Sequence, residues 1–252
     1  MKFIQSFIIL ISAFTFIGCK SKPKKDPIKA IEEAHHKTAF LSNEAVQFDI
    51  LLTFRGKERL NATITLLTNS TKGLIENKDG SKIYTHNECV YYSPNFKRVR
   101  AVRFDAYTWA YFFLFPYKLS DPGTQWSEFG ESELNGDLFN TQKLTFKAGT
   151  GDAPDDWYFV YTDQDDHLIN TAAYIVTFGK NVKTAESDPH AIKYDEYEEI
   201  NDIPIATHWT YWEWNKITGI SNQLGEATIS NIKFMKSKDV SFDIPDNYIE
   251  KK

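Results

Sequence analysis

Residues 107–117 read YTWAYFFLFPY, which is the densest aromatic run in the chain. Charged residues flank the run, with Arg103 and Asp105 before it and Lys118 and Asp121 after it. Removing a Phe-sized side chain from water is worth about 1.5–3 kcal/mol. The run must therefore fill a core, line a ligand cavity or contact a membrane.

The run continues a helical pattern that begins shortly before it. Apolar residues recur at i, i+4, i+7, i+8 and i+11, a spacing that places them on one face of a helix. They are Val102, Ala106, Trp109, Ala110 and Phe113. Further on, the run is apolar on every side until Pro116, which cannot continue a helix. We predict a central, largely buried helix that ends at this proline.

Most of the remaining chain alternates between apolar and polar residues with a period of two, which indicates antiparallel strands. An exception lies near the N-terminus, where Asp26 and Pro27 can open a helix that runs to about Phe40. At the other end, residues 240–245 are predicted to dock on the sheet as an extended tail. The strand candidates are 46–54, 60–66, 73–76, 83–85, 89–92, 137–147, 157–162, 168–178, 194–200, 207–214 and 225–235.

The N-terminal sequence has the pattern of a targeting segment. A lysine, a short apolar stretch and the pair Gly18-Cys19 are typical of a bacterial lipoprotein signal peptide. We expect residues 1–18 to be removed, Cys19 to carry lipid, residues 19–27 to form a tether and residues 28–252 to form a single domain. The alternative is an ordinary secretory signal with an incidental cysteine. Cys89 is the only other cysteine, so we expect no internal disulfide and a buried thiol.

The composition and the motifs of the chain disfavour some classes of function. The chain has 252 residues, 42% of them hydrophobic, and a formal net charge of −5. With no basic patch, nucleic-acid binding is disfavoured. No Gly-rich phosphate loop, GxSxG elbow or metal-binding histidine spacing occurs, so we expect no cofactor and no metal. The segment 163–167 resembles the start of a calcium loop but lacks its later ligands, which favours a hairpin turn.

Aromatic residues are the one concentrated signal, and in the strands they occupy both faces. Trp209 and Tyr211 share one face of their strand, whereas Trp212 and Trp214 share the other. Three interpretations stay open: a large aromatic core, an apolar ligand site, or a membrane-contact surface. The candidate ligand-binding residues are Trp109, Phe112, Phe113, Phe115, Tyr117, Trp126, Trp157, Trp209 and Trp212.

The lipobox cysteine, residues 105–123 (DAYTWAYFFLFPYKLSDPG) and residues 156–163 (DWYFVYTD) together resemble a family of uncharacterised Bacteroidota lipoproteins. That family is similar in layout to the LolA/LolB-type outer-membrane lipoprotein carriers. The resemblance implies a mainly β (α+β) fold, with a strongly curved antiparallel half-barrel of about ten strands. An N-terminal helix and a central helix would cover its concave face, which can hold acyl chains. The resemblance carries over no catalytic residue.

We therefore expect a non-enzymatic, monomeric lipoprotein of the outer membrane that binds a lipid or other apolar molecule in the concave face. The basic segment 20–25 after Cys19 favours a position facing the periplasm over one at the cell surface. One alternative is a structural or interaction module of the envelope with a filled core and no ligand. Another is a hydrolase or isomerase in the same cavity, with Asp156, His167 or His208 as acid or base.

Overall fold

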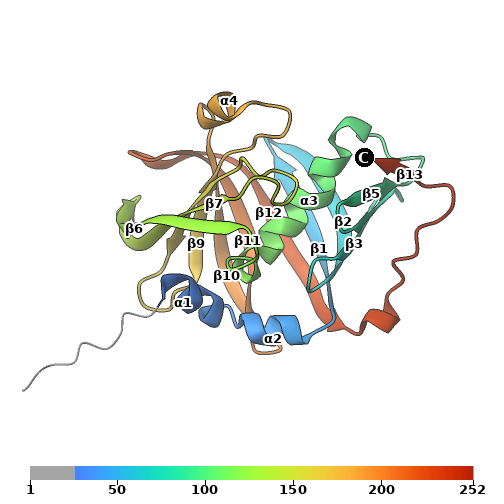
Figure 1. Ribbon diagram of the computed structural model, residues 1–252, viewed down its shortest axis with the longest axis horizontal. Helices are drawn as coiled ribbons and strands as arrows, with labels where there is room; N and C mark the ends of the chain where they lie inside the picture. The colour runs from blue at the N-terminus through green and yellow to red at the C-terminus, as the bar shows by residue number, and fades with distance from the viewer. Residues whose placement is uncertain (1–25, 252) are drawn as a thin grey trace, which may run out of the picture.

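The computed structural model describes residues 26–251 and contains one antiparallel, strongly curved sheet of 13 strands, ordered β13-β5-β4-β3-β2-β1-β12-β11-β10-β9-β8-β7-β6 (Figure 1). The strands are β1 (Ala45–Phe54), β2 (Lys57–Leu67), β3 (Lys72–Asn77), β4 (Lys82–His86), β5 (Cys89–Tyr92), β6 (Thr124–Leu134), β7 (Asp137–Phe146), β8 (Tyr158–Thr162), β9 (Ile169–Tyr174), β10 (His190–Ile200), β11 (Ile203–Asn215), β12 (Gly219–Met235) and β13 (Ile249–Lys251). The helical elements are α1 (Pro27–Ala34), α2 (Lys37–Ser42), η1 (Val99–Ala101), α3 (Val102–Leu114), η2 (Phe115–Tyr117), α4 (Val182–Glu186) and η3 (Ser237–Asp239). The predicted fold class is confirmed.

The β1–β2 hairpin forms as the alternation predicts. Its turn is Arg55-Gly56, and both residues have positive φ, 50° and 73°. Two-residue hairpin turns favour this left-handed geometry because it matches the twist of the flanking strands. From Val46 to Leu52 the even-numbered side chains of β1 are buried and the odd-numbered ones are not, so one face of the hairpin points into the core.

Strand count is where the prediction fell short, with about ten strands expected and 13 found. The largest omission is β6, an edge strand whose side chains are mostly exposed and which carries a bulge between Ser127 and Gly130. A strand that buries neither face has no apolar alternation to detect. The short β13 and the short helix α4 were also missed.

The single helix predicted to reach Phe40 is two helices. Asp26 caps α1 by accepting a hydrogen bond from the Ile28 N–H at 3.0 Å, and Pro27 occupies the first turn, as expected. The chain then turns at His36, whose φ of 50° is incompatible with a continuous right-handed helix, before α2 begins. This turn buries His35 and leaves His36 exposed.

Three apolar clusters arise because the sheet is covered on both faces. The interior cluster lies between the concave face and the helices: α3 crosses the middle of the sheet, and α1 and α2 lie at its lower end in Figure 1. An outer cluster lies on the opposite face of the sheet, over β6–β11. It consists of Leu134, Phe139, Phe159, Tyr161, Ala173, Ala191 and Trp214.

The third cluster confirms the predicted tail. Val240, Phe242 and Ile244 pack against Leu74 and Tyr84 on the sheet, and the chain then adds β13 beside β5. Phe242 is almost fully buried there. The C-terminal segment therefore belongs to the fold and covers the sheet face opposite the helices.

The predicted signal peptide, residues 1–18, and the predicted lipidation site Cys19 lie outside the described residues. Within residues 26–251, no helix is both long and apolar enough to cross a membrane. Cys89 is exposed at the start of β5, so the expectation that it would be buried is wrong. It pairs with His86 at the end of the β4–β5 hairpin, and along β5 only the alternate residues Val90 and Tyr92 are buried.

Candidate functional site

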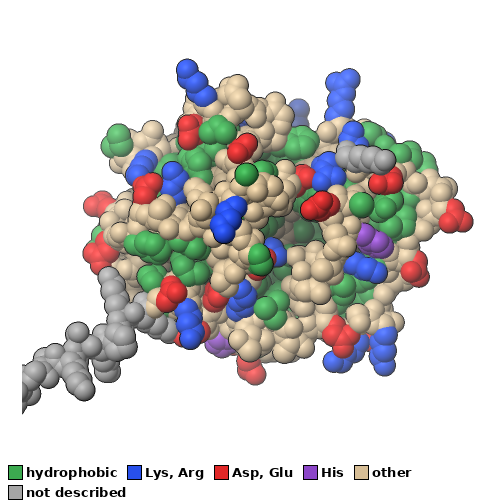
Figure 2. Space-filling view, viewed as in Figure 1, with side chains coloured by type: hydrophobic (Ala, Val, Ile, Leu, Met, Phe, Trp, Pro, Cys, Tyr) green, Lys and Arg blue, Asp and Glu red, His purple; other side chains and the backbone are tan. Residues whose placement is uncertain are grey.

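The centre of the molecule is α3, which lies across the concave face as a plug. It is apolar around most of its circumference, so it buries Val102, Ala106, Trp109 and Phe113 toward the sheet while Tyr107 and Tyr111 remain partly covered on the other side. A helix that is apolar all round is one that belongs inside a structure. The face shown in Figure 2 is hollowed near its centre, where α3 passes in Figure 1, and both acidic and basic side chains stand around this hollow.

The structure brings most of the candidate ligand-binding residues together. Six of them belong to the interior cluster, and Trp126 packs at its margin, where its Nε1 donates to the Leu119 carbonyl at 2.8 Å. Trp157 and Trp212 instead pack against the outer cluster on the opposite face. The six are Trp109, Phe112, Phe113, Phe115, Tyr117 and Trp209.

Strand parity explains why Trp157 and Trp212 are separate from the others. In β8, Tyr158 and Val160 face the helices, whereas Phe159 and Tyr161 face away. Trp157 lies one position before Tyr158 and packs edge-on against Trp214, with ring centroids 6.0 Å apart. Trp212 follows Tyr211 and takes the opposite face of β11. The aromatic side chains on both sheet faces therefore serve two separate clusters.

The concave face is filled with side chains. Phe48 stacks on Phe113 with centroids 4.0 Å apart, and Phe40 stacks on Tyr117 at 3.7 Å. A cavity beside α3, lined by Phe112, Phe113 and Tyr117 among others, has a volume of about 10 Å³. That is about the volume one water molecule needs. An acyl chain can enter this face only if α3 or its neighbours move.

Where α3 meets β11, two buried hydrogen-bonding groups have no partner among residues 26–251. They are the indole N–H of Trp109, on α3, and the hydroxyl of Tyr211, on β11. Their rings meet edge-on with centroids 6.3 Å apart. Burial raises the pKa of Tyr211 well above its usual value, so the hydroxyl stays protonated. Leaving a buried donor unsatisfied costs about 1–3 kcal/mol, which makes this pair a site where a guest oxygen would be stabilised.

Ion pairs stand beside this pair at the start of α3. The buried carboxylate of Asp105 is contacted by the Arg59 guanidinium and, at 3.3 Å, by Nε of Arg98. The Arg59 guanidinium also lies over the Trp109 ring, 5.3 Å from its centroid. Burial lowers the pKa of Arg98, Asp105 raises it and Arg59 lowers it again. Two positive charges therefore share one negative charge at this end of the plug.

The lower end of the concave face holds His35. Its Nε2 accepts a hydrogen bond from the Ile169 N–H at 3.1 Å, so Nδ1 carries the proton. Nδ1 is buried and has no partner in the part of the chain that the structure describes. The ring lines the 10 Å³ cavity together with Tyr117 and Tyr197. Burial, with a smaller contribution from His36, lowers the pKa of His35 to about 3. The imidazole is therefore neutral and acts as a fixed hydrogen-bonding group within the core.

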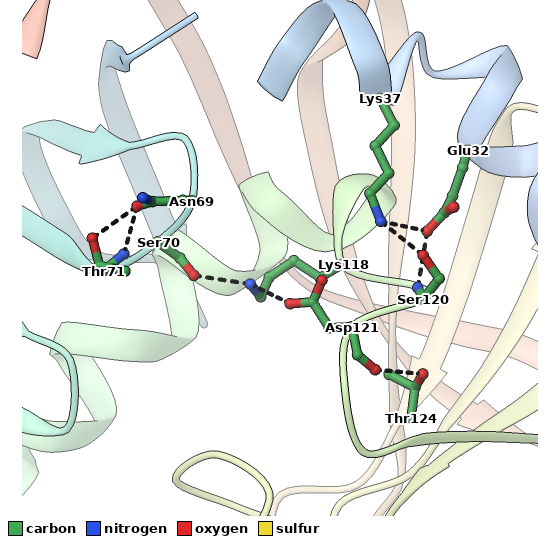
Figure 3. Close-up of polar contacts among 9 residues, drawn as sticks. All are labelled: Glu32, Lys37, Asn69, Ser70, Thr71, Lys118, Ser120, Asp121 and Thr124. Atoms are coloured by element: carbon green, nitrogen blue, oxygen red, sulfur yellow. Dashed lines mark hydrogen bonds and ion pairs between the residues drawn. The ribbon is translucent and has the colours of Figure 1, made fainter. Parts of the chain in front are cut away.

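A polar clasp, made of Glu32, Lys37, Ser70, Lys118, Ser120 and Asp121, joins the helices to the segment after the plug (Figure 3). Lys37 Nζ lies 2.7 Å from Glu32 Oε1, and that same oxygen accepts the Ser120 N–H at 2.9 Å. Lys118 Nζ lies 2.6 Å from Asp121 Oδ2 and donates to Ser70 Oγ at 2.9 Å. The clasp thereby fixes the end of the plug to α1, α2 and the β2–β3 turn.

The residues suggested for acid–base chemistry do not converge. Asp156 precedes β8 and accepts hydrogen bonds from the N–H and hydroxyl of Thr177, whereas His167 lies in the turn after β8. His208 is on β11, 3.9 Å from Glu226. The structure therefore removes the basis for an enzyme hypothesis on these residues. Across residues 26–251, no group of three or more His, Cys, Asp or Glu side chains is placed to hold a metal ion.

Sequence reasoning missed Arg59, Arg98, Asp105 and His35 as site residues. Tyr211 was recognised as sharing a face with Trp209 but was not proposed for the site. The only sequence signals were charged residues close to the aromatic run, Asp105 above all, and a histidine pair inside a helical segment. Neither signal specifies a partner, because these residues meet others that are distant in sequence.

Comparison with known proteins gives a likeness of fold. No protein-family model matches the chain, and no curated protein matches its sequence. A LolA superfamily protein from Nitrosomonas europaea superposes with a TM-score of 0.56 at 11% identity, covering 87% of this chain and 95% of that one. A Vibrio parahaemolyticus domain described as an outer membrane lipoprotein-sorting protein superposes with a TM-score of 0.51 at 12% identity, covering 85% and 97%. At these identities the likeness establishes a LolA-like fold for the chain and no more.

Proposed function

We propose that this protein is a non-enzymatic binding protein of the bacterial envelope that holds a lipid or other apolar molecule between α3 and the concave face. The observation that carries the proposal is the pair of unpartnered donors, Trp109 Nε1 and Tyr211 OH, buried on the two sides of the α3–sheet contact. The LolA-like fold supports it, since one of the similar domains is described as sorting lipoproteins.

Entry of a guest requires the plug to move. The hydrogen bond from Tyr194 OH to the Phe112 carbonyl, at 3.0 Å, is one polar link between α3 and the sheet, and aromatic contacts supply much of the rest. An acyl chain can replace aromatic contacts with other apolar contacts at little cost, because burial of apolar area is not directional. The closed arrangement is then the empty state, and the guest takes the place of part of the plug.

A matched pair of tyrosines tests this proposal. Tyr211→Phe removes an unpartnered hydroxyl, so the empty protein should keep its stability or gain about 1 kcal/mol. Tyr194→Phe removes a hydroxyl that donates to Phe112, and it should cost about 0.5–1.5 kcal/mol. Urea unfolding measures both. Only Tyr211→Phe should weaken uptake of a fluorescent fatty acid without first destabilising the empty protein.

A second experiment shows whether the protein binds a lipid at all. Native mass spectrometry of protein lacking residues 1–19, purified without detergent, should reveal a co-purifying lipid. A clean apo mass together with no uptake of fluorescent fatty acid would rule the proposal out. It would favour the second candidate, a structural or interaction module of the envelope, for which the nearly complete filling of the concave face is the supporting observation.

We further propose that Cys19 is the lipidated first residue of the mature chain and anchors it in the outer membrane, facing the periplasm. Several acyl chains make such anchoring stable, since each buried CH₂ contributes about 0.8 kcal/mol. Cys19→Ala should lose the acyl mass and move from the membrane fraction to the soluble periplasmic fraction. Retention of Cys19→Ala in the outer-membrane fraction would refute the anchor.

A further inference from the structure

We propose that a polar track along the first turns of α3 binds the anionic head of an acyl lipid, a carboxylate or a phosphate, whose chain occupies the plugged concave face. The track consists of Arg98, Asp105, Arg59, Trp109 and Tyr211. The inference rests on the proposed function and adds the chemical class of the ligand.

The track runs from solvent into the apolar interior. The Arg98 side chain is 50% exposed, that of Arg59 is 17% exposed, and that of Asp105 is 6% exposed. Trp109 and Tyr211 follow, both buried, with Arg59 stacked over the indole. A ligand with one charged end and one apolar end fits such a gradient, because its head can reach from Arg98 along Arg59 to the Trp109 N–H while its chain lies beside the inner aromatic rings.

The charge balance of the track selects an anion. Asp105 is the carboxylate that both guanidinium groups contact, so a unit of positive charge is left over. Each guanidinium carries five N–H donors in a planar fork that suits carboxylates and phosphates. Trp109 Nε1 is a donor without acceptor capacity, so an oxygen of the lipid head would supply the acceptor that it lacks among the described residues.

A local irregularity of the backbone places Arg59 in the track. In the β1–β2 ladder Leu52 pairs with Leu60 and Thr53 pairs with Glu58, which leaves Arg59 as the extra residue of a bulge. In a regular strand the neighbour of the buried Leu60 would point away from the core. Bulges re-aim side chains in this way beside functional sites. Here the bulge directs a guanidinium onto Asp105 and Trp109.

Apolar contacts around the inner end favour a lipid head over a free anion. The Tyr211 ring lies 6.0 Å from that of Phe112 and 6.1 Å from that of Phe54. A free phosphate at this depth would lose its hydration against aromatic faces, and burying an ion without full pairing is costly. An acyl chain attached to the anion offsets that cost, because the chain makes apolar contacts with the same aromatic rings.

The test compares ligands with one chain and different heads. Protein lacking residues 1–19 is titrated with palmitate, hexadecyl phosphate and hexadecanol, and a fluorescent fatty acid reports their displacement. We expect the two anions to bind at least about tenfold more tightly than the alcohol, as a charge-assisted contact predicts. Inorganic phosphate is the fourth arm and should not displace the probe at millimolar concentration.

Two arginine variants assign the effect to the track. Arg98→Gln should remove most of the preference for the anions and leave hexadecanol binding unchanged. Arg100→Gln removes the same charge from an exposed arginine in the neighbouring η1 turn and should keep the preference. Arg98 is half-exposed, so its variant is expected to fold, which circular dichroism and a thermal melt confirm before binding is measured.

Each other outcome overturns the inference in a distinguishable way. Equal affinity for palmitate and hexadecanol in the wild type would refute the headgroup site while leaving the lipid-binding proposal intact. An equal effect of Arg98→Gln and Arg100→Gln would show a long-range charge effect in place of a site. Displacement by inorganic phosphate alone would refute a lipid head, and failure of all three lipids to bind would remove the proposed function itself.

Discussion

Replacing Phe115 by alanine should lower the free energy of unfolding by about 3–5 kcal/mol, the range for large aromatic side chains deleted from a core. Phe115 is 0% exposed at the end of the plug. Its ring packs against those of Tyr158 and Tyr111, with centroids 5.0 Å and 5.7 Å away. Because the surrounding rings are large and held by their own contacts, they cannot collapse fully into the space left by the substitution.

Phe129→Ala is the matched control, because it deletes the same atoms from a residue that is 53% exposed on the edge strand β6. It should cost less than about 1 kcal/mol, as exposed substitutions generally do. Urea unfolding of the two variants measures the difference, and a thermal melt should show the Tm of Phe115→Ala lowered by about 6–20 °C. Similar costs for both variants would mean that the plug is not packed as the structure shows.

Acidification should destabilise the protein through His35. An unfolded histidine titrates near its ordinary pKa of 6.5, whereas burial lowers the pKa of His35 in the folded protein to about 3. Between these values the unfolded state binds a proton that the folded state does not, so stability is lost as the pH falls. The slope approaches about 1.4 kcal/mol per pH unit well below pH 6.5, where the unfolded histidine is fully protonated. The loss between pH 6.5 and pH 4.5 is therefore roughly 2 kcal/mol from this one group.

His35→Gln tests this, since a glutamine oxygen can still accept the Ile169 N–H but does not titrate. Unfolding free energies measured from pH 7 to pH 4.5 should fall less steeply in His35→Gln than in wild type. His36→Gln alters the exposed neighbour and is the control, expected to follow wild type. Parallel curves for wild type and His35→Gln would show that His35 is protonated at little cost in the folded state.

The sequence predicted the main helix and several strands because their apolar periods involve only residues that are close together in the chain. The stripe from Val102 to Phe113 predicted α3, and Pro116 lies where the α-helix gives way to η2. The alternation of β1 and β2 predicted their hairpin and its buried face. Such local patterns also led to the fold class, which the sheet of 13 strands confirms.

The sequence predicted only some of the contacts between aromatic side chains. The sequence separated Trp209 from Trp212 by strand parity, but parity alone does not say what covers each face. The structure shows helices over one face and the outer cluster on the other. The prediction placed Trp157 and Trp212 in one ligand site with Trp109 and the other candidates. In the structure these two residues lie on the opposite face of the sheet.

The polar part of the site could not be read from the sequence. Arg59 reaches Asp105 only because of a bulge in the ladder of β1 and β2, and a bulge leaves no mark in an alternating pattern. Whether a buried donor such as Trp109 Nε1 or Tyr211 OH finds a hydrogen-bond partner depends on the three-dimensional structure, which the sequence does not show. His35 likewise became fully buried because the chain breaks its helix at His36, which composition does not require.

The edge strand β6 bears on how the protein behaves at high concentration. An open sheet presents unpaired N–H and C=O groups at its ends, and these can recruit a second chain into a polymer. In β6 the bulge between Ser127 and Gly130 interrupts the straight run of such groups, and the exposed carboxylates of Glu131 and Glu133 would face like charges on an incoming copy. These two features oppose pairing of the β6 edge with a second copy, so this edge is a poor template for a fibre.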